Sequence, residues 1–361
     1  MLYYIYTYLT AYYSPFNVLQ YITLRSAAAM LTALIVSFLI SPVIIRKLKK
    51  YKICQNIRED GPKTHYVKSG TPTMGGLIIL ISLLSAVLLW GNLGNRFIVI
   101  LLISTIYLGL LGFVDDYLKL IKKHPKGVSA RTKMIWQIIG ACGLAFYLHF
   151  CPPNPEYGTL VNIPYFKNIF IGIGIFYFIF IVLIIVGASN AVNLTDGLDG
   201  LAVGSIIFAS LTYMIFAYVA GHAKFSSYLR IVPVSGSGEI VVFLAALVGA
   251  CLGFLWFNTY PAEIFMGDTG SLFLGGIIGV TAVIIKQEIL LLVAGGIFVF
   301  EALSVILQVF SYKVKKKRIF KMAPLHHHFE LSGWSEPKVV IRFWIIAIIL
   351  SLLALSALKL R

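Results

Sequence analysis

One stretch decides how this chain folds: residues 169–220, which read IFIGIGIFYFIFIVLIIVGASNAVNLTDGLDGLAVGSIIFASLTYMIFAYVA. Two apolar runs, 169–187 and 201–220, flank a short polar segment that holds Asp196 and Asp199. A helix needs roughly 17–25 predominantly apolar residues to cross the ~30 Å of hydrocarbon in a bilayer. The stretch therefore predicts two membrane-spanning helices joined by an acidic turn.

The composition of the whole chain agrees with this prediction. Of its residues, 59% are hydrophobic and only 12% are charged, whereas a soluble domain is about half apolar and a quarter charged. Lipid must replace water as the solvent over most of the surface. We predict an all-α, polytopic integral membrane protein, a single transmembrane domain over 1–361. About ten helices are expected, near 24–45, 75–91, 97–114, 134–151, 169–187, 201–220, 239–257, 272–287, 289–310 and 340–357.

The positive charges indicate how the chain crosses the membrane. The loops 46–74, 115–133 and 311–339 hold 21 Lys and Arg residues, and the loops and termini of the opposite side hold 7. Cytoplasmic loops carry the excess of positive charge, so both termini are predicted to be periplasmic. This topology accounts for the net charge of +16 without a nucleic-acid partner. The expected cytoplasmic, active-site face consists of loops 46–74, 115–133, 188–200, 258–271 and 311–339.

Acidic residues gather on that same face. Only 14 are present in 361 residues, and five aspartates lie near the cytoplasmic ends of predicted spans. Ionisable groups at membrane depth are costly, and like charges repel unless a cation lies among them. Carboxylate oxygens without thiolates suit Mg²⁺. One such motif is more often a helix cap beside a turn, but three on one face favour a functional site. The aspartates are Asp115, Asp116, Asp196, Asp199 and Asp268.

Basic side chains near these aspartates have the chemistry to hold phosphate. Lys63 and Lys68 precede a Gly/Thr/Pro turn that leads into the second predicted span, and no GxxxxGK[ST] motif is present. Lys119 and Lys133 flank the next cytoplasmic loop. These lysines predict a phosphate-binding surface that is not a P-loop.

A run of three histidines follows in MAPLHHHFE, at 326–328. Consecutive helical residues turn by about 100°, so three in a row cannot all face one metal. Contact with phosphate or sugar, or helix capping, is the better interpretation than a zinc site. Glu301 is the only acid at mid-span. We expect it to pair with Gln308 or with a polar group of another span, and contact with substrate is the alternative.

Four motifs together carry a resemblance that covers essentially the whole chain. They are DDxxK, NxxNxTDGLDGLA, GFLWFNTYPAxxFMGDTGSL and PLHHHFExxGWxEPK. The set resembles the polyprenyl-phosphate N-acetylhexosamine-1-phosphate transferase superfamily. Within that superfamily, the triple-histidine motif is similar to that of the bacterial phospho-N-acetylmuramoyl-pentapeptide transferase family.

The resemblance implies a reaction and a location. Phospho-MurNAc-pentapeptide would pass from UDP-MurNAc-pentapeptide to undecaprenyl phosphate, giving undecaprenyl-diphospho-MurNAc-pentapeptide (lipid I) and UMP in peptidoglycan synthesis. The enzyme would use Mg²⁺, form a homodimer, and span the bacterial inner membrane with its active site facing the cytoplasm. A diphosphate from the cytosol and a lipid phosphate at the membrane surface can meet at cytoplasmic helix ends.

The resemblance also implies roles for particular residues. Asp268 is the expected main Mg²⁺ ligand, with Asp115 and Asp116 completing the metal centre. Asp115 would take the proton from the lipid phosphate, or alternatively an aspartate attacks first and forms a covalent intermediate. The catalytic set also includes Lys119, Lys133, His326, His327 and His328. The expected substrate-binding set is Lys68, Thr73, Asn190, Asn193, Asp196, Gly197, Leu198, Asp199, Asn258, Phe265 and Gln308.

Two rival interpretations remain at this point. Intramembrane carboxylates often mark the ion path of a transporter, but transporter sites lie near the bilayer midplane, and here only Glu301 is central. The other rival is a sister transferase that moves GlcNAc-1-phosphate to the same lipid and should lack the PLHHHFE motif. Phe265 is expected to stack on uracil or, equally, to anchor the chain at the membrane boundary.

Overall fold

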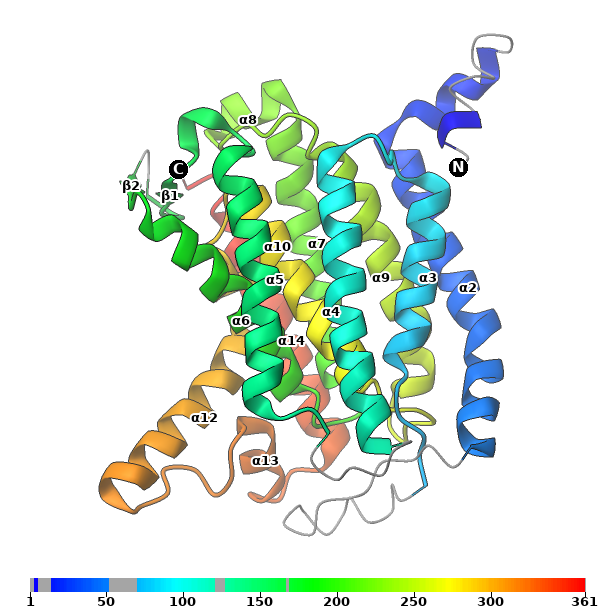
Figure 1. Cartoon of the computed structure of the whole chain (residues 1–361), viewed down its shortest axis with the longest axis vertical. Helices are drawn as coiled ribbons and strands as arrows, with labels where there is room; N and C mark the ends of the chain where they lie inside the picture. The colour runs from blue at the N-terminus through cyan, green and yellow to red at the C-terminus, as the bar shows by residue number, and fades with distance from the viewer. Residues whose placement is uncertain (1–2, 6–13, 52–69, 121–126, 167–168, 361) are drawn as a thin grey trace.

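The computed structural model describes residues 3–5, 14–51, 70–120, 127–166 and 169–360. Long helices run roughly along one axis of the molecule (Figure 1). They are α2 (Ile22–Lys50), α3 (Gly76–Trp90), α4 (Arg96–Leu120), α5 (Ala130–Phe150), α6 (Phe176–Thr195), α7 (Leu201–Gly221), α9 (Gly238–Asn258), α10 (Asp268–Ile284), α12 (Gly296–Lys315) and α14 (Glu336–Ser356).

Short elements connect these helices. A two-stranded antiparallel sheet lies near one end of the bundle, where Val161 pairs with Ile171. The strands are β1 (Leu160–Asn162) and β2 (Phe170–Gly172), and the short helices are η1 (Ser14–Gln20), η3 (Pro155–Tyr157), α8 (Ala223–Leu229), α11 (Leu291–Ala294) and α13 (Leu325–Glu330).

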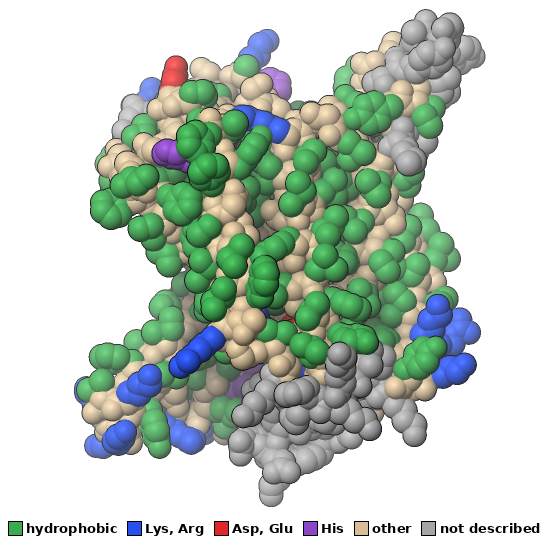
Figure 2. Space-filling view, viewed as in Figure 1, with side chains coloured by type: hydrophobic (Ala, Val, Ile, Leu, Met, Phe, Trp, Pro, Cys, Tyr) green, Lys and Arg blue, Asp and Glu red, His purple; other side chains and the backbone are tan. Residues whose placement is uncertain are grey.

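The prediction of a helical, polytopic membrane protein is confirmed. Seven helices of the described chain are long and apolar enough to cross a membrane: α2, α4, α6, α7, α9, α12 and α14. Helices α3 and α10 are equally apolar but have only 15 and 17 residues. Hydrophobic side chains cover the middle of the face shown in Figure 2.

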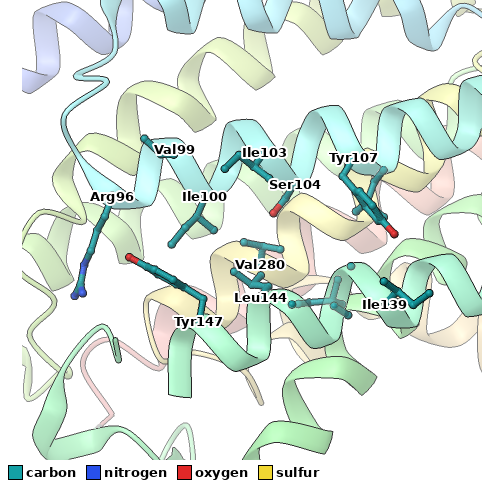
Figure 3. Close-up of a pocket in the computed structure, with 15 residues that line it drawn as sticks. Arg96, Val99, Ile100, Ile103, Ser104, Tyr107, Ile139, Leu144, Tyr147 and Val280 are labelled. Atoms are coloured by element: carbon teal, nitrogen blue, oxygen red, sulfur yellow. The ribbon is translucent and has the colours of Figure 1, made fainter. Parts of the chain in front are cut away.

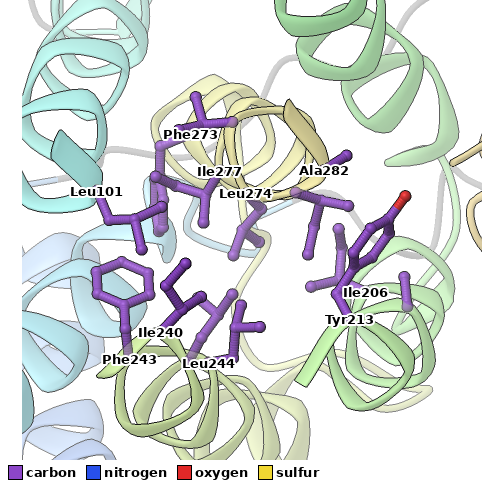
Figure 4. Close-up of a cluster of buried hydrophobic side chains, with 14 of the residues drawn as sticks. Leu101, Ile206, Tyr213, Ile240, Phe243, Leu244, Phe273, Leu274, Ile277 and Ala282 are labelled. Carbon is purple, nitrogen blue, oxygen red and sulfur yellow. The ribbon is translucent and has the colours of Figure 1, made fainter. Parts of the chain in front are cut away.

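Helix α10 lies at the centre of the bundle. Every one of its residues from Thr269 to Ile284 is buried, and its apolar side chains interlock with those of α4, α7 and α9 (Figure 4). Phe243 of α9 and Tyr213 of α7 are among the largest fully buried side chains in this cluster. A helix that is apolar all round must be surrounded by protein or lipid, and α10 is surrounded by protein.

Small residues allow α2 and α9 to pack closely. Lipid tails are as apolar as leucine, so helices in a membrane associate largely through close van der Waals packing. Gly249 of α9 lies against the backbone of Met30, where a Cβ would be 2.1 Å from the carbonyl oxygen. Gly253, four residues further on, lies against Ser37. Ala29 and Ala33 of α2 are also fully buried.

We expect Gly249→Leu to prevent this packing and to abolish the folded state. The side chain would overlap the backbone of Met30, which cannot move without displacing α2. Fluorescence-detected size exclusion of the solubilised chain measures the result, and a monodisperse peak would contradict it. Gly143→Leu is the matched control, because a Cβ at Gly143 meets nothing within 4 Å.

Two expected spans begin at the wrong residue. The run 169–187 was expected to be helical throughout, but 170–172 form β2, and α6 begins only at Phe176. Gly172 and Gly174 favour this extended start, and Gly174 adopts a φ of +53°. Helix α6 then continues to Thr195. The expected loop 188–200 is therefore confined to 196–200, which follows the helix.

The run 289–310 also differs from its expected position. A short helix, α11, comes first, and α12 begins at Gly296 and extends to Lys315. The lower part of α12 leans away from the bundle, with α13 beside it (Figure 1). The expected loop 311–339 thus contains the end of α12, all of α13 and the start of α14.

The two ends of the bundle differ in charge. The start of α2 and the end of α14 lie at one end (Figure 1). At the other end, Lys and Arg side chains gather where α2 and α12 finish (Figure 2), and Lys47, Lys49, Lys313 and Lys315 lie in those last turns. Helices α4 and α6 finish at this basic end, and α10 begins there (Figure 1).

Candidate active site

The first turn of α10 is held by a carboxylate from α4. Asp116 accepts hydrogen bonds from the backbone amides of Asp268 (3.2 Å) and Thr269 (2.9 Å) and from the Thr269 hydroxyl (2.6 Å). The first amides of a helix have no partner within the helix and carry partial positive charge. Asp116 therefore caps α10 from outside and fixes the position of Asp268.

A glycine of α4 makes this approach possible. A Cβ on Gly112 would lie 2.1 Å from the Asp268 carbonyl oxygen. Gly112 precedes Asp116 by four residues, so both lie on one face of α4. Neither Gly112 nor Thr269 was identified from the sequence. The signal in the sequence is a glycine one helical turn before an aspartate, since the glycine lets another backbone approach the helix at that point.

Two lysines join the remaining carboxylates of the cluster. The Lys133 Nζ lies 2.7 Å from Asp115 Oδ2 and 2.5 Å from Asp268 Oδ2. The Lys119 Nζ lies 2.6 Å and 3.1 Å from the same two oxygens. Asp115 is fully buried, and its Oδ1 accepts from the Val128 amide at 2.7 Å. A buried carboxylate is tolerated when it is paired in this way.

Asp196 brings a further carboxyl group to the same place. It follows the last residue of α6, and the Gly267 amide donates to its carboxylate. Burial, together with the charges of Asp268 and Asp116, raises the pKa of Asp196 to about 8. A cation bound beside these carboxylates would favour the charged form of Asp196 and so lower this pKa.

Thr73 and Asn193 border the cluster. A Cβ on Gly267 would lie 3.0 Å from the Thr73 hydroxyl and 2.8 Å from Asp116. Asn193, from α6, accepts from the Ser271 hydroxyl at 2.8 Å. The backbone of Phe265 pairs with the segment before α3, since its amide donates to the Pro72 carbonyl at 2.9 Å.

The cluster fits Mg²⁺ in the manner that is usual for this ion. Among the described residues, no three His, Cys, Asp or Glu side chains form a group that could hold a metal alone. Both oxygens of Asp116 are occupied by α10, whereas the two lysines neutralise Asp115 and Asp268. Mg²⁺ is commonly held by one or two carboxylates while substrate phosphates and water complete its octahedron. Asp268 and Asp115 have the chemistry for such a site.

A second group of polar residues fixes the loops beside the cluster. The Asp199 amide donates to Glu336 at 2.9 Å, and its carboxylate accepts from the Ala262 amide at 3.0 Å. The Asn258 side chain accepts from Gly200 N and donates to the Ile264 carbonyl. Glu336 was not identified from the sequence, although EPK was part of a quoted motif.

His326 of α13 faces the same loop. A Cβ on Gly197 would lie 2.3 Å from its Nε2, so only glycine fits at that position. Its Nδ1 lies 3.1 Å from Glu301 Oε2, and its amide donates to Oε1. The expected pairing of Glu301 with Gln308 or with a group in another span is therefore wrong. Glu301 instead anchors α13 against α12.

Other predicted site residues form hydrogen bonds with groups outside the carboxylate cluster. Gln308 binds the backbone of Ile319 and Phe320. His327 pairs with Glu330 at 2.8 Å. These contacts lie within α12, α13 and the segment that joins them, and so does the hydrogen bond from the Lys321 amide to His328 Nδ1.

Asn190 and Leu198 have structural partners as well. The Asn190 side chain donates to Gln137 of α5 and to the Val186 carbonyl, both at 2.8 Å. Leu198 is buried in a small apolar cluster with α14. Lys68 and Lys63 lie outside the described residues.

Comparison with known proteins adds independent findings. The family described as Glycosyl transferase family 4 matches residues 98–286, and a phospho-N-acetylmuramoyl-pentapeptide-transferase signature matches residues 68–80. Phospho-N-acetylmuramoyl-pentapeptide-transferases from Endomicrobium trichonymphae and Citrifermentans bemidjiense are each 54% identical over 361 residues, the full length of both chains. The one from Thermodesulfovibrio yellowstonii is 55% identical over 362 aligned positions, again at full coverage.

Proposed function

This chain belongs to the phospho-N-acetylmuramoyl-pentapeptide transferase family, and from that premise we propose how its site acts. It transfers phospho-MurNAc-pentapeptide from UDP-MurNAc-pentapeptide to undecaprenyl phosphate, giving lipid I and UMP in peptidoglycan synthesis. The observation that carries the assignment of the site is the cluster of Asp115, Asp268, Lys119 and Lys133 at the basic end of the bundle.

We propose that this end faces the cytoplasm of a bacterium, in the inner membrane. The gathering of Lys and Arg at the ends of α2 and α12 supports this orientation. Helices α3, α5 and α10, added to the seven long apolar ones, would give ten crossings. An even number agrees with α2 starting and α14 finishing at the same end of the bundle.

The lysines are suited to two phosphate groups. Lys119 is 37% exposed at its side chain and Lys133 is 14% exposed, and the ammonium groups of both contact the buried Asp115. An ammonium group acts as a compact point charge on phosphate. We propose that arriving phosphates draw Lys119 and Lys133 partly away from the carboxylates. Asp268 would then be free to hold Mg²⁺.

The chemistry is a single displacement at phosphorus. An oxygen of the lipid phosphate attacks the β-phosphorus of the UDP-sugar, and the bond from that phosphorus to the bridging oxygen of UMP breaks. Asp115 accepts the proton of the lipid phosphate. Mg²⁺ held by Asp268 would neutralise charge on the diphosphate and on departing UMP. The remaining contribution of the protein is positioning and charge stabilisation.

The surroundings of Asp115 argue against its acting as a covalent nucleophile. Its Oδ1 is occupied by the Val128 amide, and its Oδ2 contacts both Lys119 and Lys133. An oxygen that acts as a nucleophile must reach phosphorus in line, and Asp115 is fully buried. Accepting a proton asks less, because Oδ2 needs only to come within hydrogen-bond reach of the lipid phosphate once the lysines move. We therefore propose direct attack by the lipid phosphate. A phosphosugar adduct trapped on Asp115 in a single turnover would contradict this route.

The direct test measures UMP release by the purified chain with undecaprenyl phosphate. We expect release from UDP-MurNAc-pentapeptide and none from UDP-GlcNAc, because the α13 motif marks the muramoyl branch. Release from UDP-GlcNAc alone would instead identify the sister transferase. The family resemblance also implies a homodimer, which the mass of the solubilised chain in the same preparation tests.

A further inference from the structure

Helix α5, which carries Lys133, has an open side toward α4. An apolar groove of about 680 Å³ opens between the two helices, with Ile103 of α4 and Leu144 of α5 on its walls. Val280 of α10 lies between them (Figure 3). Tyr107 joins the helices at one level, where its hydroxyl donates to the Trp136 carbonyl at 2.7 Å. Because α5 packs more closely against α6 than against α4, α6 has the larger part in fixing its position.

The inner face of α5 has little apolar bulk near the basic end of the bundle. Within 130–140, Gln137 is the only buried residue, and Ala141 and Ala145 follow it on the same face. Lys133 precedes Gln137 by one helical turn and so lies on this face as well. Helices in a membrane associate through close packing and through hydrogen bonds between helices. With so little side-chain area to pack, the start of α5 depends on the hydrogen bonds of Gln137.

Gln137 uses both ends of its side-chain amide. Its Nε2 donates to Ser189 Oγ at 3.1 Å, and its Oε1 accepts from Asn190 Nδ2 at 2.8 Å. Both partners belong to α6 and are adjacent in sequence, so the two bonds resist sliding of α5 along α6 and rotation of α5 about its own axis. A buried polar group of this kind can specify the register of packed helices.

Ser189 extends the link to α10. Its hydroxyl donates to the Leu272 carbonyl at 2.9 Å. Leu272 follows Asp268 by four residues, as Gln137 follows Lys133. The hydrogen-bonded path from Gln137 through Ser189 to Leu272 therefore joins the two helices that the Lys133–Asp268 ion pair also joins, about 6 Å further along each helix at 1.5 Å per residue.

We infer that Gln137 and Asn190 are positioning residues, which hold α5 in the register that lets Lys133 reach Asp115 and Asp268. The inference rests on the proposed function and deepens it. Asn190, which the family resemblance places among the substrate-binding residues, then acts on the reaction through Lys133. Neither amide touches the reacting groups, because each is hydrogen-bonded within the bundle.

The test combines Gln137→Leu with the loss of Lys133. Leucine has a similar size but makes neither hydrogen bond, and each partner keeps another: Ser189 with Leu272 and Asn190 with the Val186 carbonyl. Because a misplacement of ~1 Å can cost about 10²-fold in rate, we expect Gln137→Leu to lower kcat/KM about tenfold. In Lys133→Met, the same change should lower kcat/KM by less than about twofold, because the group that Gln137 positions is absent.

Two further variants complete this comparison. Ser189→Ala removes one of the two bonds to Gln137, so it should cause a smaller loss than Gln137→Leu, and this loss should also disappear in Lys133→Met. This milder variant tests the inference if Gln137→Leu does not fold. Thr105→Val is the matched control, because Thr105 of α4 is fully buried but its hydroxyl donates within its own helix, to the Leu101 carbonyl. It should leave kcat/KM unchanged with or without Lys133.

A chemical measurement tests the position of Lys133 without turnover. In the folded Gln137→Leu or Ser189→Ala variant, acetic anhydride should acetylate Lys133 faster than in the wild type, with the exposed Lys224 as the internal reference. Mass spectrometry of the digested chain gives both rates.

Two results would overturn the inference. One is an equal fractional loss of kcat/KM with and without Lys133, which would show that Gln137 acts independently of the lysine. The other is acetylation of Lys133 at the wild-type rate in the folded variants. Absence of transfer by the wild-type chain would instead contradict the proposed function, and the acetylation rates would still decide whether Gln137 positions Lys133.

Discussion

Asp268→Asn should lower kcat by at least ~10³-fold without unfolding the protein. The variant keeps the shape of the side chain but removes the charge that pairs with Lys133 and Lys119 and that would hold Mg²⁺. Electrostatic stabilisation of developing charge is usually the largest single contribution to catalysis, and residues that act as a unit show losses of this size or greater. Asp268 begins α10, whose position is fixed by Asp116 through backbone amides, so the fold should survive.

Two measurements on one preparation decide this prediction. UMP release gives kcat, and thermal unfolding in detergent reports whether the bundle is intact. Glu156→Gln is the matched control, since Glu156 is an exposed acid near the other end of the bundle. Asp268→Asn turning over at the wild-type rate would remove Asp268 from the reaction.

Lys133→Met should lower kcat/KM by roughly 10²-fold. The Lys133 side chain is only 14% exposed, and its ammonium group contacts both Asp115 and Asp268. Without it, two neighbouring carboxylates lose a positive partner, and the loss of one member of a buried charge pair is strongly destabilising. Phosphate binding also loses a point charge. Initial rates at varied UDP-MurNAc-pentapeptide and undecaprenyl phosphate concentrations give the effect on each substrate.

Lys119→Met provides the internal comparison. Lys119 contacts the same two oxygens, but its side chain is 37% exposed, so water screens it more. We expect a loss of about tenfold, an order of magnitude smaller than that of Lys133→Met. Equal losses of kcat/KM in the two variants would contradict the larger role that we assign to Lys133 because its side chain is more buried. Lys133→Arg, which keeps the charge, should recover part of the activity.

Much of the fold could be predicted because apolar length is a direct consequence of bilayer thickness. The predicted spans are wrong where an apolar run does not form a helix. Residues 169–175 are as hydrophobic as a span, but strand pairing with 160–162 competes for their backbone hydrogen bonds. Hydropathy also did not show that α10 is central, since a helix buried in protein and one exposed to lipid are equally apolar.

The sequence was enough to predict which charged residues belong to the candidate site. It was not enough to predict which groups these residues contact. The sequence placed Asp115, Asp116 and Asp268 on one face, but it could not show that Asp116 is a helix cap. That role depends on Gly112 allowing α10 to approach, a contact between segments far apart in the chain. Likewise, Glu301 and His326 pair across 25 positions, and periodicity holds no information about such a pair.

The location of the divalent ion tests the account most directly. Mn²⁺ binds oxygen ligands as Mg²⁺ does, and its anomalous scattering in crystals soaked with UDP-MurNAc-pentapeptide gives its position. We predict one ion in contact with Asp268 and the diphosphate, at the end of the bundle where α10 begins. An ion bound elsewhere, with Asp268 still paired to Lys133, would contradict the proposed centre.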